Sequence, residues 1–78
     1  MEIEIKCKIE PKHLEIIRKY AKLVEKTDDR EVYRFLNVTA VIKDGVATIS
    51  MRIKSEKEAP KAQKKLLAMA SKFGLEVC

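Results

Sequence analysis

The dipeptide Asp44-Gly45 stands between two runs of β-prone residues and constrains the fold of this 78-residue chain more than any other feature. Asp-Gly favours a two-residue type I′ turn, because glycine accepts a positive φ and aspartate tolerates one. Such a turn sets Lys43 opposite Val46 and thereby fixes the register of a β-hairpin. On one face of that hairpin every predicted pair is apolar: Ile42 with Ala47, Ala40 with Ile49, Val38 with Met51, and Leu36 with Ile53.

The opposite face of the hairpin is mostly polar, but Phe35, Val41 and Val46 interrupt it. If these three side chains are exposed together, they provide apolar anchors for a second subunit. The first strand of the hairpin, taken as 32–43, is expected to have a free edge, and free edges pair readily with other chains. The sequence therefore predicts an interface at this edge and on these three residues.

The segment 1–10 alternates apolar and charged residues, which is typical of a strand with one buried face. Pro11 suits the first turn of a helix, where its missing N–H costs nothing. From there Leu14, Ile17, Ala21 and Val24 recur at helical spacing. We expect this helix to end at the turn-forming residues 27–29.

A second helix is expected near the C-terminus. Pro60 favours a start near Ala59, whereas Ser55 with Glu58 resembles a capping box and favours an earlier start; we favour the later one. Gly74 is a natural residue to follow the helix, and 75–78 is a possible short last strand. The predicted core stripe of this helix consists of Ala62, Leu66, Met69, Ala70 and Phe73.

These elements predict one α+β domain over residues 1–78, in the order β-α-β-β-α with a possible final strand. Right-handed connections place both helices on one face of an antiparallel sheet. With the last strand, the arrangement is the ferredoxin-like split βαβ fold with strand order 4-1-3-2. Without it, the sheet has three strands and the first strand is an unpaired edge.

The chemistry of an enzyme is not evident. His13 is the single histidine, no cysteine pair has zinc-site spacing, and two glycines are too few for a phosphate loop. Asp28, Asp29 and Glu31 offer weak ligands for a hard cation, but a turn is the favoured interpretation. We expect no catalytic residues, no metal and no cofactor.

The two cysteines, Cys7 and Cys78, are not expected to form a disulfide, because Cys7 falls on the predicted core face and Cys78 ends the chain. No apolar run is long enough to cross a membrane, and no signal peptide is evident. The expected location is the cytoplasm. Abundant Lys and Glu with few amides is typical of heat-adapted, archaeal-like proteins.

The net charge of +5 and pI near 9.3 permit binding to an acidic partner such as RNA. Phosphate contacts by clustered lysines would give salt-sensitive binding that ignores sequence. A solvated helix face is the alternative and is slightly favoured. The densest basic region comprises Arg52, Lys54, Lys57, Lys61, Lys64, Lys65 and Lys72.

In length and element order the chain resembles the small dimerising subunit of the KEOPS tRNA-modification complex. The resemblance includes the strand end Ile9-Glu10-Pro11 and the helix start Leu14-Glu15-Ile16. It implies a non-catalytic homodimer that bridges an enzyme subunit and helps to engage tRNA. The last helix departs from the Leu-Arg-Ala and Asn-Ser pattern of that family, since residues 62–71 contain no Arg and no Asn.

Two functions are therefore expected. The leading one is a non-catalytic assembly module, either a homodimer or a subunit of a complex in tRNA or RNA processing. The alternative is a basic RNA- or ribosome-binding protein that acts through the lysine-rich last helix.

Overall fold

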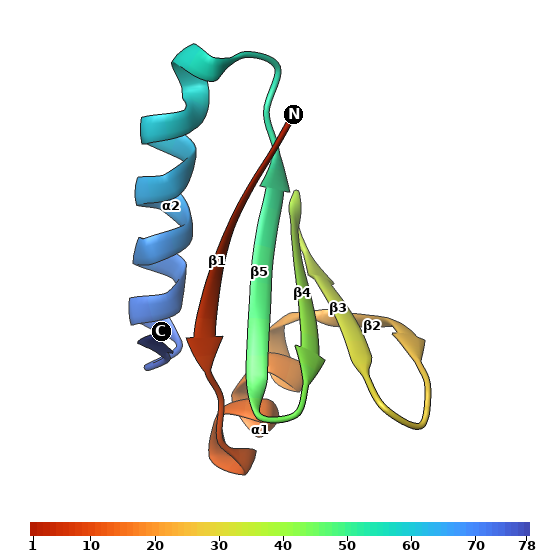
Figure 1. Ribbon diagram of the computed structural model, residues 1–78. Coiled ribbons are helices and arrows are strands. Elements are labelled where there is room, and N and C mark those ends of the chain that lie inside the picture. Colours follow the sequence, from red (N-terminus) through yellow and green to blue (C-terminus); the bar gives the residue numbers. More distant parts are fainter.

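All 78 residues are described in a computed structural model, which shows one antiparallel sheet and two α-helices (Figure 1). The predicted α+β class is confirmed. The six strands lie in the order β2-β3-β4-β5-β1-β6. Along the chain the elements are β1 (Glu2–Lys8), α1 (Pro11–Tyr20), β2 (Lys22–Lys26), β3 (Glu31–Phe35), β4 (Val38–Lys43), β5 (Val46–Arg52), the 3-10 turn η1 (Glu56–Glu58), α2 (Ala59–Lys72) and β6 (Glu76–Val77).

The central hairpin of β4 and β5 has the predicted register. Asp44 and Gly45 have φ values of 51° and 75°, as a type I′ turn requires. Three of the four predicted apolar pairs are present: Ile42 with Ala47, Ala40 with Ile49, and Val38 with Met51. On its other side β5 pairs with β1, so β1 is an interior strand.

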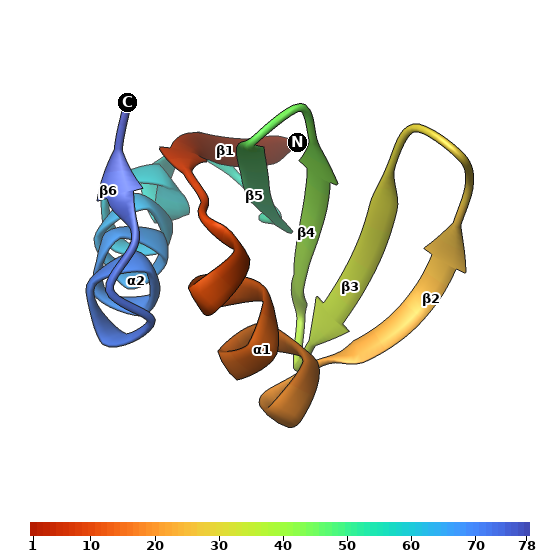
Figure 2. The same ribbon diagram turned by 90° about the horizontal axis from the view of Figure 1, so that it is seen from below.

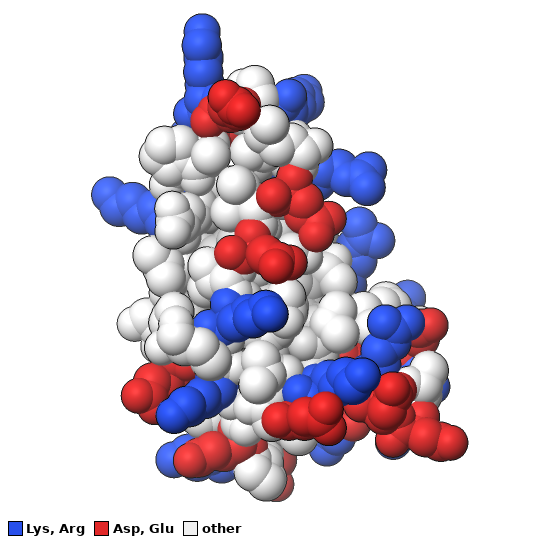
Figure 3. Space-filling view, in the orientation of Figure 1, with Lys and Arg blue, Asp and Glu red and all other residues white.

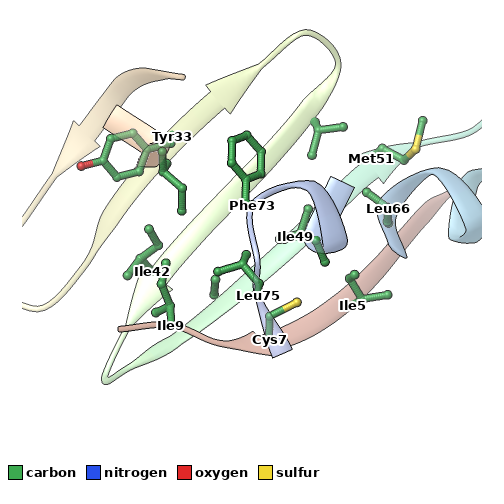
Figure 4. Close-up of a cluster of buried hydrophobic side chains, with 14 of the residues drawn as sticks. Ile5, Cys7, Ile9, Tyr33, Ile42, Ile49, Met51, Leu66, Phe73 and Leu75 are labelled. Carbon is green, nitrogen blue, oxygen red and sulfur yellow. The ribbon is translucent and has the colours of Figure 1, made fainter. Parts of the chain in front are cut away.

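The sheet is curved, and both helices lie on its concave face (Figure 2). The core contains 16 buried residues, and none of them is charged. Alternate residues of β1, β4 and β5 pack with Leu66 and Phe73 in one cluster (Figure 4), to which Ile17 of α1 also belongs. No helix covers the convex face, so the strands are buried on one side only.

The first helix is shorter than predicted. It ends at Tyr20, where Ala21 turns to an extended conformation, and Lys22–Lys26 forms β2 instead of a last helical turn. A four-residue loop connects β2 to β3. The Thr27 N–H donates to the Arg30 carbonyl at 2.9 Å and closes this loop. Leu23 and Val24 fit a helical spacing, but pairing with β3 provides backbone hydrogen bonds and overrides that local pattern.

The strand predicted over 32–43 is two strands. A two-residue turn at Leu36 and Asn37 folds β3 back onto β4, so that Phe35 pairs with Val38. Leu36 is therefore not opposite Ile53 in the core but 74% exposed, with φ at 55°. The sequence does not predict this turn, because an L-residue with a bulky side chain rarely adopts positive φ.

The ferredoxin-like strand order is not confirmed. The predicted strands do lie in the order β6-β1-β5-β4, but β3 and β2 extend the sheet beyond β4 to six strands. The helix after β1 leads into β2 at the far edge, rather than into the central hairpin. The domain therefore has one more hairpin than the sequence predicted.

The C-terminal predictions are confirmed. The helix α2 begins at Ala59, and the capping box of Ser55 and Glu58 is also present, one turn earlier in η1, where the Ser55 N–H donates to Glu58 Oε2 at 3.2 Å. Gly74 has φ at 73°, and the Leu75 N–H donates to the Ala70 carbonyl at 2.8 Å. This closure directs the chain into β6, which pairs with β1.

We predict that Leu36→Gly raises the free energy of unfolding by about 1 kcal/mol, because glycine removes the cost of a left-handed backbone. Little buried surface is lost, since the side chain is exposed. Urea denaturation measures the change. The control is Leu36→Ala, which removes the same exposed side chain but keeps Cβ. An equal gain from both variants would show that backbone strain is not the cause.

Candidate interaction surfaces

The open edge of the sheet is β2. It pairs with β3 on one side and with nothing on the other, and all five of its residues are exposed. The predicted free edge, on the strand 32–43, is wrong, because β3 lies between β2 and β4 and both sides of β4 are paired. At the opposite edge β6 has only two residues. The sheet therefore has two stretches without a partner strand: the outer side of β2 and, near α2, the part of β1 before Cys7.

Exposed apolar side chains accompany this edge. Four of the eight large apolar residues that are exposed fall within residues 16–24. Ile16 and Tyr20 are one turn apart on the same face of α1, and Leu23 and Val24 of β2 are 44% and 50% exposed. We call Leu23 and Val24 the β2-edge surface. The sequence assigned these residues to a single helix and therefore gave no indication of this surface.

A polar cluster fastens α1 to β3 beside this surface. Arg18 Nε donates to the Tyr33 hydroxyl at 3.0 Å, and a terminal guanidinium nitrogen of Arg18 lies 3.3 Å from Glu31 Oε1. The Tyr33 hydroxyl donates to the same carboxylate oxygen. Tyr33 is 2% exposed, so its ring belongs to the core while its hydroxyl reaches the surface. Sequence analysis missed this cluster, because the register of β3 was not known.

The pKa values in the cluster are shifted. The hydrogen bond from Tyr33, together with Arg18, holds the pKa of Glu31 below its ordinary value of 4.5. Burial, followed by the hydrogen bond to Glu31, raises the pKa of Tyr33. Both shifts keep the carboxylate ionised and the phenol protonated at neutral pH. The cluster therefore stabilises the contact of α1 with β3.

The aromatic residues gather on the concave side. Phe73 lies 6.3 Å from Tyr20 and 6.4 Å from Phe35 between ring centroids. A cavity of about 30 Å³ lies beside them, with apolar lining residues that include Tyr33, Phe35 and Phe73. Since Phe35 packs on the concave face, it does not lie with Val41 and Val46, and that part of the predicted interface is wrong.

Val41 and Val46 do lie on the convex face, where each is half-buried. Val41 pairs with Val32 on β3, which sequence analysis did not select, and with Thr48 on β5. Val46 stands between Lys8 and Lys43. Figure 3 shows acidic and basic residues interspersed over this face of the molecule.

The predicted basic residues are only partly brought together. Arg52, Lys61 and Lys65 line one hollow of about 220 Å³ between the end of β5 and the first turns of α2. None of the lysines on α2 makes an ion pair within 4.0 Å. The remaining predicted residues, Lys54, Lys57, Lys64 and Lys72, are exposed but do not line this hollow.

Cys7 is fully buried, and burial raises the pKa of its thiol. Cys78 is exposed, and both thiols are free. His13 accepts a hydrogen bond from the Glu10 N–H at 3.0 Å and so caps α1. No group of three or more His, Cys, Asp or Glu side chains is placed to hold a metal ion. No helix is long and apolar enough to cross a membrane.

Comparison with known proteins identified no relatives. No protein-family model, no curated protein sequence and no solved structure matches the chain.

We predict that Glu31→Gln lowers the free energy of unfolding at pH 7 by about 1 kcal/mol, since it breaks charge-assisted hydrogen bonds at a partly exposed site. The folded-state pKa of Glu31 is depressed, so its stabilisation is present above its ordinary pKa and is lost as pH falls below about 5. Urea denaturation between pH 3 and 7 should show a smaller loss on acidification in the variant.

Tyr33→Phe is a second test of this cluster, because it keeps the buried ring and removes only the hydroxyl. The pKa of Glu31, measured by NMR titration, should then rise toward its ordinary value. If the free energy of unfolding depended on pH equally in wild type and Glu31→Gln, the assigned role of the cluster would be contradicted.

Proposed function

We propose that the protein is a non-catalytic assembly module that pairs with a second copy of itself through β2. The observation that carries this proposal is an edge strand whose five residues are all exposed and which includes Leu23 and Val24. An unpaired strand with apolar side chains is a template for pairing with another chain. With 16 of 78 residues buried, the core is small, and small domains often gain stability from a partner.

The charges of β2 fit a second copy. Lys22 and Glu25 pair with Arg34 and Val32 of β3, so both lie on the convex face. In an antiparallel pair of β2 strands, Lys22 can approach Glu25 of the partner subunit, and such cross-strand pairs are favourable. The irregular register between Leu23 and Glu25 bends the strand, and such a bulge disfavours indiscriminate pairing of an edge.

A wider proposal rests on the resemblance to the KEOPS dimerising subunit in length and in the segments Ile9-Glu10-Pro11 and Leu14-Glu15-Ile16, since the extra hairpin of β2 and β3 departs from the element order of that family. In it, the dimer belongs to a larger cytoplasmic complex that processes tRNA or other RNA. The chain would contribute assembly, and a partner subunit would contribute the chemistry.

We predict a concentration-dependent dimer, which sedimentation equilibrium measures directly. Leu23→Lys should weaken the dimer by about tenfold or more, because it places a charge at the centre of the apolar contact. The matched control is Leu67→Lys on α2, where the leucine is 40% exposed against 44% for Leu23. A wild-type chain that is strictly monomeric at high concentration would contradict the proposal, as would equal weakening by both variants.

One observation favours a second candidate function. The hollow that joins Arg52, Lys61 and Lys65 offers three cations without ion pairs to the phosphates of RNA. None of the four aromatic residues lines it, so the protein would bind the RNA backbone rather than stack on bases.

For this candidate we predict RNA affinity that falls steeply with salt and is lost when Lys61, Lys64 and Lys65 are replaced by Glu. The control replaces Lys12, Lys19 and Lys26, which lie on α1 and β2, with the same change of charge. Electrophoretic mobility shift at several salt concentrations measures the RNA affinity of both triple variants. Equal loss in the two triple variants would mean that net charge alone governs binding.

A further inference from the structure

A polar hollow of about 300 Å³ lies on the convex face, apart from the β2-edge surface. It lies over strands β1, β5, β4 and β3, and neither helix reaches it. Figure 3 views this face and shows basic side chains beside acidic ones. The residues that line the hollow are Glu2, Arg34, Asn37, Thr39, Ser50, Met51 and Arg52.

The sheet register brings four side chains that donate hydrogen bonds to this hollow. Thr39 of β4 is directly opposite Ser50 of β5 and also opposite Arg34 of β3. Arg52 follows Ser50 by two residues on the same strand and so lies on the same face. Two hydroxyl groups therefore lie between two guanidinium groups, on strands that backbone hydrogen bonds hold in place.

No other side chain of the protein forms an ion pair or hydrogen bond with these four donor residues. The chain has four arginines, and two of them form ion pairs: Arg18 with Glu31, and Arg30 with Glu25. Arg34 and Arg52 form neither an ion pair nor a side-chain hydrogen bond, and the same holds for the Thr39 and Ser50 hydroxyls. Arg52 does not pair with Glu2, although the two residues are opposite each other in the register.

We propose that this hollow binds a phosphate group. The planar guanidinium presents two parallel N–H donors that match phosphate oxygens, and hydroxyl and amide donors complete such sites. Thr39, Ser50 and Asn37 supply those further donors around Arg34 and Arg52.

The surroundings of the hollow favour a small phosphate monoester over a nucleic-acid strand. Glu2 and Glu4 stand along β1 on the same face, where they repel a polyanion that extends across the sheet. No aromatic residue lines the hollow, so a nucleotide base finds no stacking partner. Glu2 also weakens the site itself, so its removal should strengthen binding.

The test is an NMR titration of the full chain with inorganic phosphate at constant ionic strength. We expect shifts centred on Arg34, Thr39, Ser50 and Arg52. Arg34→Gln and Arg52→Gln should each weaken binding by about tenfold or more, and Glu2→Gln should tighten it. The control is Arg30→Gln, which removes a guanidinium on the β2–β3 loop and should leave the affinity unchanged.

Wild-type affinity in Arg34→Gln and Arg52→Gln would overturn the proposal, as would shifts that spread over the lysines of α2. A second arm uses an RNA oligomer without a terminal phosphate. If that oligomer binds more tightly than phosphate and depends equally on Arg34 and Arg52, the ligand is an RNA strand and the assignment to a small monoester is wrong. Neither arm depends on the oligomeric state, so the result is independent of the proposed dimer.

Discussion

The sheet of this protein is covered by helices on one face only, and the remaining structure depends on that constraint. Each strand must present alternate residues to the concave side, so the register of every pair decides what is buried. The type I′ turn at Asp44 and Gly45 sets this register at the centre of the sheet. The same alternation decides which residues lie on the convex face and along the edge strand β2. Charged side chains and unpaired backbone N–H and C=O groups are found there.

Local signals predicted much of this architecture. The turn at Asp44-Gly45, the alternation in β1 and the closure at Gly74 each depend on a few neighbouring residues, and each is confirmed. The failures occur at the hairpin of β2 and β3 and at the turn that follows it. Residues 22–26 fit a helix or a strand, and only contact with β3 selects the strand. Leu36 turns the chain with a positive φ that its side chain disfavours, so no turn was predicted there.

The candidate sites were also predicted in part and missed in part. Arg52, Lys61 and Lys65 were selected from charge density, and the structure places them around one hollow. Arg34 was missed, because its position beside Thr39 depends on the turn that was not foreseen. The predicted interface residue Phe35 moved to the concave face for the same reason. A single turn that was not predicted therefore changed both the interface and the composition of the polar face.

The central claim is that β2 is an open edge which a second copy completes. Hydrogen exchange measured at increasing protein concentration tests it most directly, because pairing would protect the outward N–H groups of β2. We predict that protection rises with concentration within residues 22–26 and stays constant in β5 and α2. Exchange in β2 that is independent of concentration, or new protection confined to another surface, would contradict the account.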